Sequence, residues 1–286
     1  MKDQCIMSKY CDLHTHSVYS DGTWTPTQII NEAEKIGLSA VALTDHNEIN
    51  GLTEFFNAAE GKKLEAIGGV ELSTDYGPFE LHIVGLFVQE KHFKKIESFV
   101  DELRWREVES NRMIISALQC AGYKVDYDEI KEKYPQVHIN RAHISTSLFE
   151  KGYTQSPSEA LRTLLSKSGQ FYVDAKRLDV FKSIQFLKEI GCVTVLAHPF
   201  QELTEEDLCP FLKRAKSFGL DAMETEYAKY NDETINLAKK IAKKYNLKES
   251  GGSDFHGERR KDVYLGVGKG NLRIPIAFVE ELRNNL

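Results

Sequence analysis

Short apolar runs in this chain repeatedly end in histidine or carboxylate residues, and this recurrence limits the folds that the chain can adopt. The runs occur in CDLHTHSVYSDG, AVALTDH, AIGGVE, VTVLAHP and ESGGSDFH. Polar side chains that follow the strands of a (β/α) barrel meet on one face of that barrel. The pattern therefore predicts one multinuclear metal centre. Its candidate ligands are His14, His16, Asp21, His46, Glu71, His82, His198, Asp254 and His256.

Two of the motifs place their polar residues at the spacing of a strand face. One residue separates His14 from His16, and one residue separates Asp254 from His256. Side chains at i and i+2 of an extended strand point to the same side, so each pair can reach one ion. An isolated HxH is more commonly a surface or core pair, and an isolated His82 would equally suit a structural role. The interpretation as ligands depends on the recurrence of such motifs.

The types of donor restrict the choice of metal. Imidazole and carboxylate donors without cysteine suit Mn²⁺, Fe²⁺ or Zn²⁺. We expect Mn²⁺ first, with Fe²⁺ or Zn²⁺ as alternatives. The candidate ligands are too many for one ion and are enough for two or three ions with positions left for water and substrate.

The order of apolar runs predicts the architecture. Strand-like runs alternate with helix-like stretches near both ends of the chain, which indicates a parallel sheet. About seven strand candidates predict an irregular (β/α) barrel, an α/β fold. The middle of the chain is charged and mostly helical, and we interpret it as an insertion that covers one mouth of the barrel. The expected division is a barrel over residues 8–90 and 178–286 and a helical cap over residues 91–177.

Composition excludes some classes of partner. The formal net charge of −6 argues against an extended nucleic-acid surface, although a small anionic substrate remains compatible with it. The five cysteines are scattered and suit reduced thiols in a cytoplasmic protein. No stretch approaches the roughly 18 consecutive apolar residues of a membrane span. We therefore expect neither a signal peptide nor a membrane partner.

Six ordered segments resemble the signatures of the PHP superfamily, named for polymerases and histidinol phosphatases. They are DLHTHSxxSDG, ALTDH, GVE, LHIVG, LAHP and GGSDFHG, between Asp12 and Gly257. The resemblance implies a distorted (β/α)₇, TIM-like barrel with a trinuclear metal site bound by the candidate ligands above. It also implies a metal-dependent phosphoesterase, a hydrolase that acts on a small phosphorylated substrate.

Within the superfamily, the chain is similar to small stand-alone phosphoesterases with a helical insertion. This branch includes nucleoside 3′,5′-bisphosphate phosphatases, which remove the 3′-phosphate of pAp. We expect this reaction, carried out by metal-activated hydroxide. The alternatives are a cyclic (sugar) phosphate phosphodiesterase and a 5′–3′ exoribonuclease on short RNA ends.

The resemblance also suggests residues outside the metal ligands. NRAHI is similar to an RPH segment of this branch, with Ala142 where proline is usual, and implies catalytic and substrate-binding roles for Arg141 and His143. The alternative is a pair on a helix surface. Lys176 and Tyr172 are further candidates for substrate contact.

Three carboxylates are candidates for supporting roles. Asp12 and Asp45 are expected to act in catalysis by orienting metal-bound histidines. Glu224, near the end of a predicted strand, could also face the site.

Three rival functions are compatible with parts of the pattern. A metal-dependent amidohydrolase would also use HxH motifs and a barrel, but the SDG, TDH and SDxH combination argues against it. A non-catalytic PHP module would not need the complete set of ligands. A histidinol phosphatase is less compatible with the GGSDFHG ending and the position of the insertion.

Overall fold

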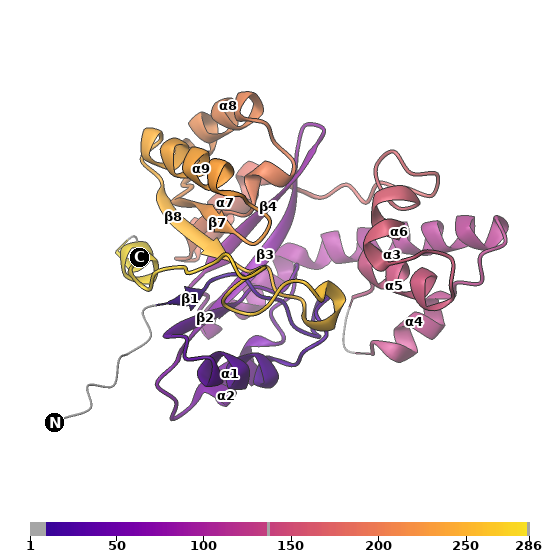
Figure 1. Ribbon diagram of the computed structural model, residues 1–286. Helices are drawn as coiled ribbons and strands as arrows, with labels where there is room; N and C mark the ends of the chain where they lie inside the picture. The colour runs from indigo at the N-terminus through magenta and orange to yellow at the C-terminus, as the bar shows by residue number, and fades with distance from the viewer. Residues whose placement is uncertain (1–9, 136–137, 285–286) are drawn as a thin grey trace.

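Within the part of the chain that the structure describes, eight strands form a single sheet that curls into a nearly closed barrel (Figure 1). The computed structural model describes residues 10–135 and 138–284, so Cys5 and the predicted barrel limits at residues 8 and 286 lie outside it. The strands run in the order β1-β2-β3-β4-β6-β7-β8, with β5 paired to β3. Their bounds are β1 Cys11–Asp12, β2 Ala40–Leu43, β3 Glu65–Tyr76, β4 Phe79–Leu86, β5 Leu178–Asp179, β6 Val193–Leu196, β7 Ala222–Tyr227 and β8 Lys248–Gly252.

Helices connect most of these strands. The α-helices are α1 Pro26–Lys35, α2 Leu52–Ala59, α3 Phe93–Cys120, α4 Tyr127–Lys133, α5 Arg141–Glu150, α6 Pro157–Thr163, α7 Val180–Glu189, α8 Glu205–Ala215, α9 Asp232–Lys244 and α10 Ala277–Arg283. Short 3₁₀ helices occur at η1 Glu90–His92, η2 Pro199–Gln201, η3 Lys216–Phe218 and η4 Gly257–Arg260.

Hydrogen bonds near the ends of β1 and β8 bring the two edges of the sheet together. Leu13 N donates to Gly251 O at 3.2 Å, and Asp254 N donates to His14 O at 2.9 Å. The two candidate ligand pairs of the sequence analysis therefore lie side by side. The expected distorted (β/α)₇ barrel is confirmed.

Strand β4 departs from the parallel order that the sequence predicted. It is antiparallel to both β3 and β6, with Tyr76 opposite Phe79. A parallel connection needs a crossover of a dozen or more residues, whereas the β3–β4 connection is a tight turn. Gly77 adopts φ 58° in this turn, a conformation that glycine accepts without steric cost.

The two faces of the sheet pack into different apolar clusters. Along β2, Val41 and Leu43 pack with the surrounding helices, whereas Ala40 and Ala42 pack into the barrel interior. This alternation follows from the two-residue period of a strand. The interior cluster closes the barrel beneath the edge that carries the polar motifs.

The segment between β4 and β5 forms helices with a cluster of their own. Helices α4, α5 and α6 lie beside the far half of α3, away from the barrel (Figure 1). Ile114, Leu118, Ile144 and Leu148 belong to this buried cluster. The division into a barrel and a cap over residues 91–177 stays a prediction.

Gly252 provides a test of how tightly β1 and β8 approach each other. A Cβ at this position would lie 2.1 Å from His14 Cβ. We expect Gly252→Ala to lower the free energy of unfolding by about 1–3 kcal/mol, because overpacking a tight core forces the backbone to shift. Urea unfolding measures the effect, and a variant as stable as the wild type would contradict this close packing.

Candidate metal centre

The structure brings all nine predicted ligands together on one side of the barrel. Their donor atoms form four overlapping groups, and within each group the atoms lie within 4.8 Å of one another. The groups are His16, Asp21, His46 and His256; His14, Glu71 and His198; His14, His16 and Asp254; and His46, Glu71 and His82. The overlap fits a multinuclear centre better than separate single-ion sites.

Glu71, in β3, lies at the middle of this arrangement. Its side chain is fully buried, and its carboxylate oxygens lie 2.8–3.3 Å from ring nitrogens of five histidines. These histidines are His14, His16, His46, His82 and His198. A carboxylate placed between two sets of imidazoles is positioned to bridge two ions.

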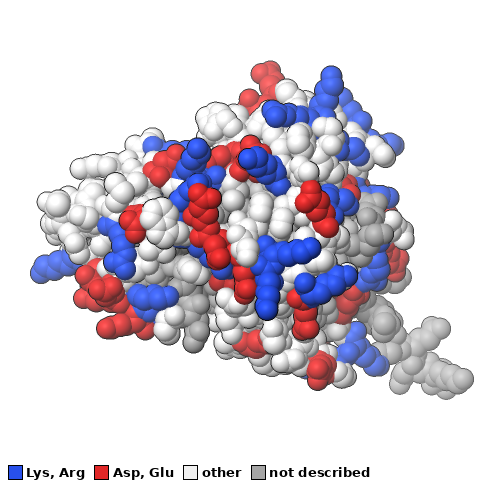
Figure 2. All heavy atoms as spheres, turned by 180° about the vertical axis from the view of Figure 1, so that it is seen from behind, with Lys and Arg blue, Asp and Glu red and all other residues white. Residues whose placement is uncertain are grey.

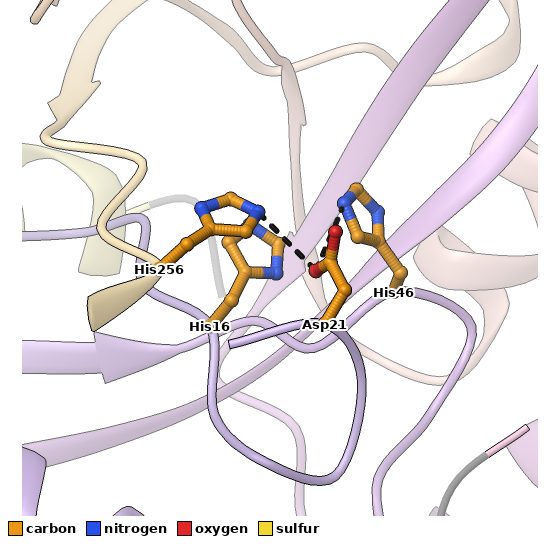
Figure 3. A group of neighbouring side chains, drawn as sticks. All are labelled: His16, Asp21, His46 and His256. Atoms are coloured by element: carbon orange, nitrogen blue, oxygen red, sulfur yellow. Dashed lines mark ion pairs between the residues drawn. The ribbon is translucent and has the colours of Figure 1, made fainter. Parts of the chain in front are cut away.

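Asp21, in the loop after β1, meets histidines from two further segments of the chain (Figure 3). Its Oδ1 lies 3.2 Å from His256 Nε2 and 3.8 Å from His46 Nε2. His16 lies beside them, with its ring centroid 4.2 Å from that of His256. The loop after β1, the end of β2 and the turn after β8 thus contribute to one group of donors.

The buried donor atoms fit divalent cations. Among the described residues, several have no hydrogen-bond partner although they are inaccessible to solvent. These atoms include His14 Nε2, His16 Nε2, His46 Nδ1, His256 Nε2, Asp21 Oδ1 and Glu71 Oε2. Buried polar atoms normally have partners, and leaving them unpaired is costly. A cation bound between them would satisfy them together.

Other groups fix the orientation of the candidate ligands. Glu224, in β7, places Oε1 2.8 Å from His14 Nδ1 and accepts a hydrogen bond from His198 N at 2.7 Å. His256 Nδ1 lies 2.8 Å from Asp254 O. A partner on one ring nitrogen directs the other nitrogen toward the metal. Glu224 therefore faces the site, as the sequence analysis suggested.

Asp254 also has contacts that hold its carboxylate. Oδ2 accepts a hydrogen bond from Tyr227 Oη at 2.7 Å and pairs with Arg260. Oδ1 is left facing His16 Nε2 at 3.3 Å. One oxygen is thus anchored while the other points to the cluster.

Asp12 and Asp45 are buried but differ from the prediction in what they contact. Asp12 accepts hydrogen bonds from Ser253 N at 2.9 Å and from Gly266 N at 2.8 Å. Asp45 accepts from Ser17 N at 2.7 Å and from the Ser20 hydroxyl. Neither forms a hydrogen bond with an imidazole nitrogen among the described residues. They hold the backbone of the ligand-bearing loops rather than the histidine rings.

Burial and the neighbouring carboxylates shift the pKa values of the histidines in opposite directions. Burial alone lowers the pKa of a histidine, but Asp254 and Glu71 raise that of His16 to about 9. Against the same burial, Glu71 raises the pKa of His82 to about 10. Burial dominates at His46, where the pKa falls to about 3. Some of the candidate ligands must therefore lose a proton before they can bind a metal near neutral pH.

A cleft of about 680 Å³ leads to the centre between the barrel and helices α3, α5 and α6. Asp21, His46, His82 and His198 line its barrel side. The lining also includes several cationic side chains, namely Arg104, Arg141, Arg162, Lys167 and Arg177. A small anionic substrate could therefore contact the candidate ligands and these cationic side chains together.

Arg141 and Arg177 converge on one carboxylate in this cleft. Glu80 Oε2 lies 3.1 Å from Arg141 Nη2 and 2.7 Å from Arg177 Nη2. Glu80 Oε1 lies 3.6 Å from His82 Nε2. The two guanidinium groups are thus linked through Glu80 to a candidate metal ligand.

The other predicted substrate residues do not line the cleft, although the Tyr172 ring lies 5.4 Å from the Arg141 guanidinium, and their substrate roles stay a prediction. His143 is buried, and its Nδ1 accepts a hydrogen bond from Asn140 N in the capping box of α5. Tyr172 is half-buried and Lys176 is exposed; neither lines the cleft. The cleft position next to Lys176 is occupied by Arg177, which the sequence analysis missed. The two adjacent basic residues before β5, Lys176 and Arg177, indicated that a cation could reach the cleft, but the sequence did not show which of the two side chains turns inward.

The chain belongs to the PHP domain family, whose signature it matches over residues 12–176. Its relatives include hydrolases of phosphoric esters, and its own structure clusters donors that can bind metal ions. The chain is therefore a metal-dependent phosphoric ester hydrolase.

Three relatives differ in the substrate that their names specify. A 5′–3′ exoribonuclease of Haemophilus influenzae is 30% identical, over 87% of this chain and 91% of the relative. A 3′,5′-nucleoside bisphosphate phosphatase of Chromobacterium violaceum is 28% identical, over 88% and 90%. A phosphoribosyl 1,2-cyclic phosphate 1,2-diphosphodiesterase of Eggerthella lenta is 30% identical, over 89% and 97%.

Structural comparison supports the same class. The crystal structure of a protein from Bifidobacterium adolescentis, described as a metal-dependent phosphoesterase, superposes with a TM-score of 0.85 at 25% identity. The superposition covers 96% of each chain. No helix among residues 10–135 and 138–284 is long and apolar enough to cross a membrane.

The raised pKa values of His16 and His82 predict how stability depends on pH. A raised pKa in the folded state stabilises the protein below the ordinary value near 6.5, and this contribution is lost as pH rises through about 9 to 10. Chelator-treated protein should therefore lose stability between pH 7 and 10 in urea unfolding. Mn²⁺-loaded protein should lose less because the cation replaces the protons. Parallel curves for the two forms would contradict this.

Substituting Glu224 tests the support of His14. We expect Glu224→Gln to weaken metal binding by about 10–100-fold, the usual effect of removing such a carboxylate. Glu226→Gln is a matched control in the same strand, because Glu226 instead pairs with Lys239 at 2.7 Å. Equilibrium dialysis with Mn²⁺ compares the two variants, and equal affinities would remove Glu224 from this role.

Proposed function

We propose that this enzyme removes the 3′-phosphate from a nucleoside 3′,5′-bisphosphate such as pAp. The observation that carries the proposal is the pair Arg141 and Arg177, which lies in the same cleft as the donor cluster and is connected to it through Glu80. A substrate with two phosphates suits a site with two anion-binding regions, namely the donor cluster with its metal ions and the arginine pair. The Chromobacterium relative supports this choice of substrate.

Each region would bind one of the phosphates. Divalent ions held by the nine donors would supply an activated water and would neutralise charge on the reacting phosphate. Arg141 presents a guanidinium whose fork geometry suits phosphate oxygens. Arg177 is 6% exposed and is held by Asp75 and Glu80, so it would contribute fixed positive charge. The second phosphate would then orient the substrate toward the donor cluster.

A 5′–3′ exoribonuclease on short RNA is a second candidate. Arg162 and Lys167 also line the cleft, and these cations could contact a further nucleotide. On the face drawn in Figure 2, acidic and basic side chains are interspersed. This mixture suits a short RNA end better than an extended nucleic acid. The Haemophilus relative supports this alternative.

Analysis of the products formed by Mn²⁺-loaded protein separates the candidates, because a phosphomonoester yields inorganic phosphate, an RNA yields 5′-mononucleotides and a cyclic phosphate yields a ring-opened product. The panel contains pAp, AMP, a 5′-phosphorylated RNA trimer, a cyclic ribose phosphate and histidinol phosphate. A strong preference for pAp is the expected result. Preference for the trimer or for the cyclic phosphate would keep the phosphoesterase class and replace the proposed substrate.

Arg141 provides the residue-level test of this function. Loss of a hydrogen bond to a charged group costs about 1.5–3 kcal/mol, so we expect Arg141→Ala to lower kcat/KM for pAp by about 10–100-fold. Arg162→Ala is the control, because this arginine is proposed to contact the further nucleotide of an RNA and should affect the RNA trimer more than pAp. An Arg141→Ala enzyme with unchanged kinetics on pAp would contradict the assignment.

A further inference from the structure

The segment that carries His46 has an unusual backbone conformation. Asn47, the next residue, adopts φ 50°, which is uncommon for a residue other than glycine. Its side chain accepts a hydrogen bond from Ser73 N at 2.9 Å and donates one to Ser73 Oγ at 3.1 Å. Its backbone N donates to Glu71 O at 2.9 Å. This conformation therefore ties the His46 segment to the strand that carries Glu71.

Arg104 reaches the same segment from the middle of α3. Its Nε donates to Asn47 O at 2.9 Å, and its Nη2 lies 3.1 Å from Glu48 Oε1. The same Glu48 oxygen accepts hydrogen bonds from the backbone N–H groups of the next two residues, at 2.8 and 2.9 Å. One guanidinium therefore holds a carbonyl and a carboxylate in the two residues that follow His46.

Both charges of the ion pair between Arg104 and Glu48 are buried. The side chains of Arg104 and Glu48 are 8% and 3% exposed. A buried ion pair that loses one partner leaves an uncompensated charge, which strongly destabilises its surroundings. Glu107, three residues after Arg104 in the same helix, adds a second contact by accepting from Asn47 Nδ2 at 3.3 Å. Helix α3 thus contacts the His46 segment at two points.

We propose that Arg104 is a positioning residue for the metal centre, and that it acts by holding His46 in its ligand geometry. Helix α3 then has a second role besides forming the wall of the cleft, since it completes a site whose ligands all come from the barrel. The inference rests on the proposed metal centre but not on the identity of the substrate.

The arrangement of donors makes the proposal selective. His46 belongs to the group with His16, Asp21 and His256 and to the group with Glu71 and His82. The groups formed by His14, Glu71 and His198 and by His14, His16 and Asp254 do not contain it. Loss of the Arg104 contact should therefore weaken only part of the metal binding.

Two variants and one control test this. Arg104→Lys keeps the charge but cannot reach both partners with one ammonium group. The double variant Arg104→Met/Glu48→Gln removes the pair without leaving a buried charge. Arg106→Ala is the control, because this arginine of the same helix contacts Glu102 and Lys176 O instead. Mn²⁺ binding is measured on each full-length protein by stepwise titration, and pAp kinetics are measured at limiting and at saturating Mn²⁺.

The proposal predicts that both Arg104 variants bind part of the Mn²⁺ about 10–100-fold less tightly, while the remaining Mn²⁺ binding is unchanged. Saturating Mn²⁺ should restore turnover, with KM for pAp unaltered. Wild-type Mn²⁺ binding in both variants would overturn the proposal, and a raised KM with normal Mn²⁺ binding would instead make Arg104 a substrate contact. If the wild type binds Mn²⁺ but does not cleave pAp, the proposed function fails while the Mn²⁺ comparison still decides this inference.

Discussion

The site depends on the contacts between the buried carboxylate of Glu71 and the surrounding histidines. This carboxylate lies within 3.3 Å of ring nitrogens from five histidines, and its side chain has no exposure to solvent. Such a cluster is stable only when protons or cations balance its charges, because buried charges without partners are costly. The barrel brings these side chains together through strand ends that are far apart in the sequence. The metal centre is therefore a consequence of the way the sheet closes, and not of one local motif.

The helical segment between β4 and β5 adds what the barrel lacks. The candidate metal ligands all come from the barrel, whereas Arg104 and Arg141 come from the helices and Arg177 from the chain that returns to the sheet. Arg104 contacts the His46 segment directly, and the other two arginines meet at Glu80 beside His82. The segment consequently contributes both to the site where a phosphate would bind and to the support of a ligand.

Much of the fold and the proximity of the ligands could be predicted from the sequence, because strand ends and the HxH and DxH spacings have direct geometric consequences. Contacts that depend on side-chain direction could not. Lys176 was predicted and its neighbour Arg177 lines the cleft, since only the three-dimensional path of the returning chain selects between them. His143 caps a helix, and Asp12 and Asp45 bond to backbone and serine groups instead of imidazoles. The antiparallel β4 was missed because the alternation of strands and helices hid a tight turn.

The most direct test of the account is the number of divalent ions bound by the wild type and by Glu71→Gln, measured by elemental analysis after dialysis against Mn²⁺. The account predicts two or three ions for the wild type, as expected for its number of donors, and the loss of more than one ion from the variant, because Glu71 belongs to two of the donor groups. A wild type with a single ion, or a variant with an unchanged number, would contradict a multinuclear centre built around this carboxylate.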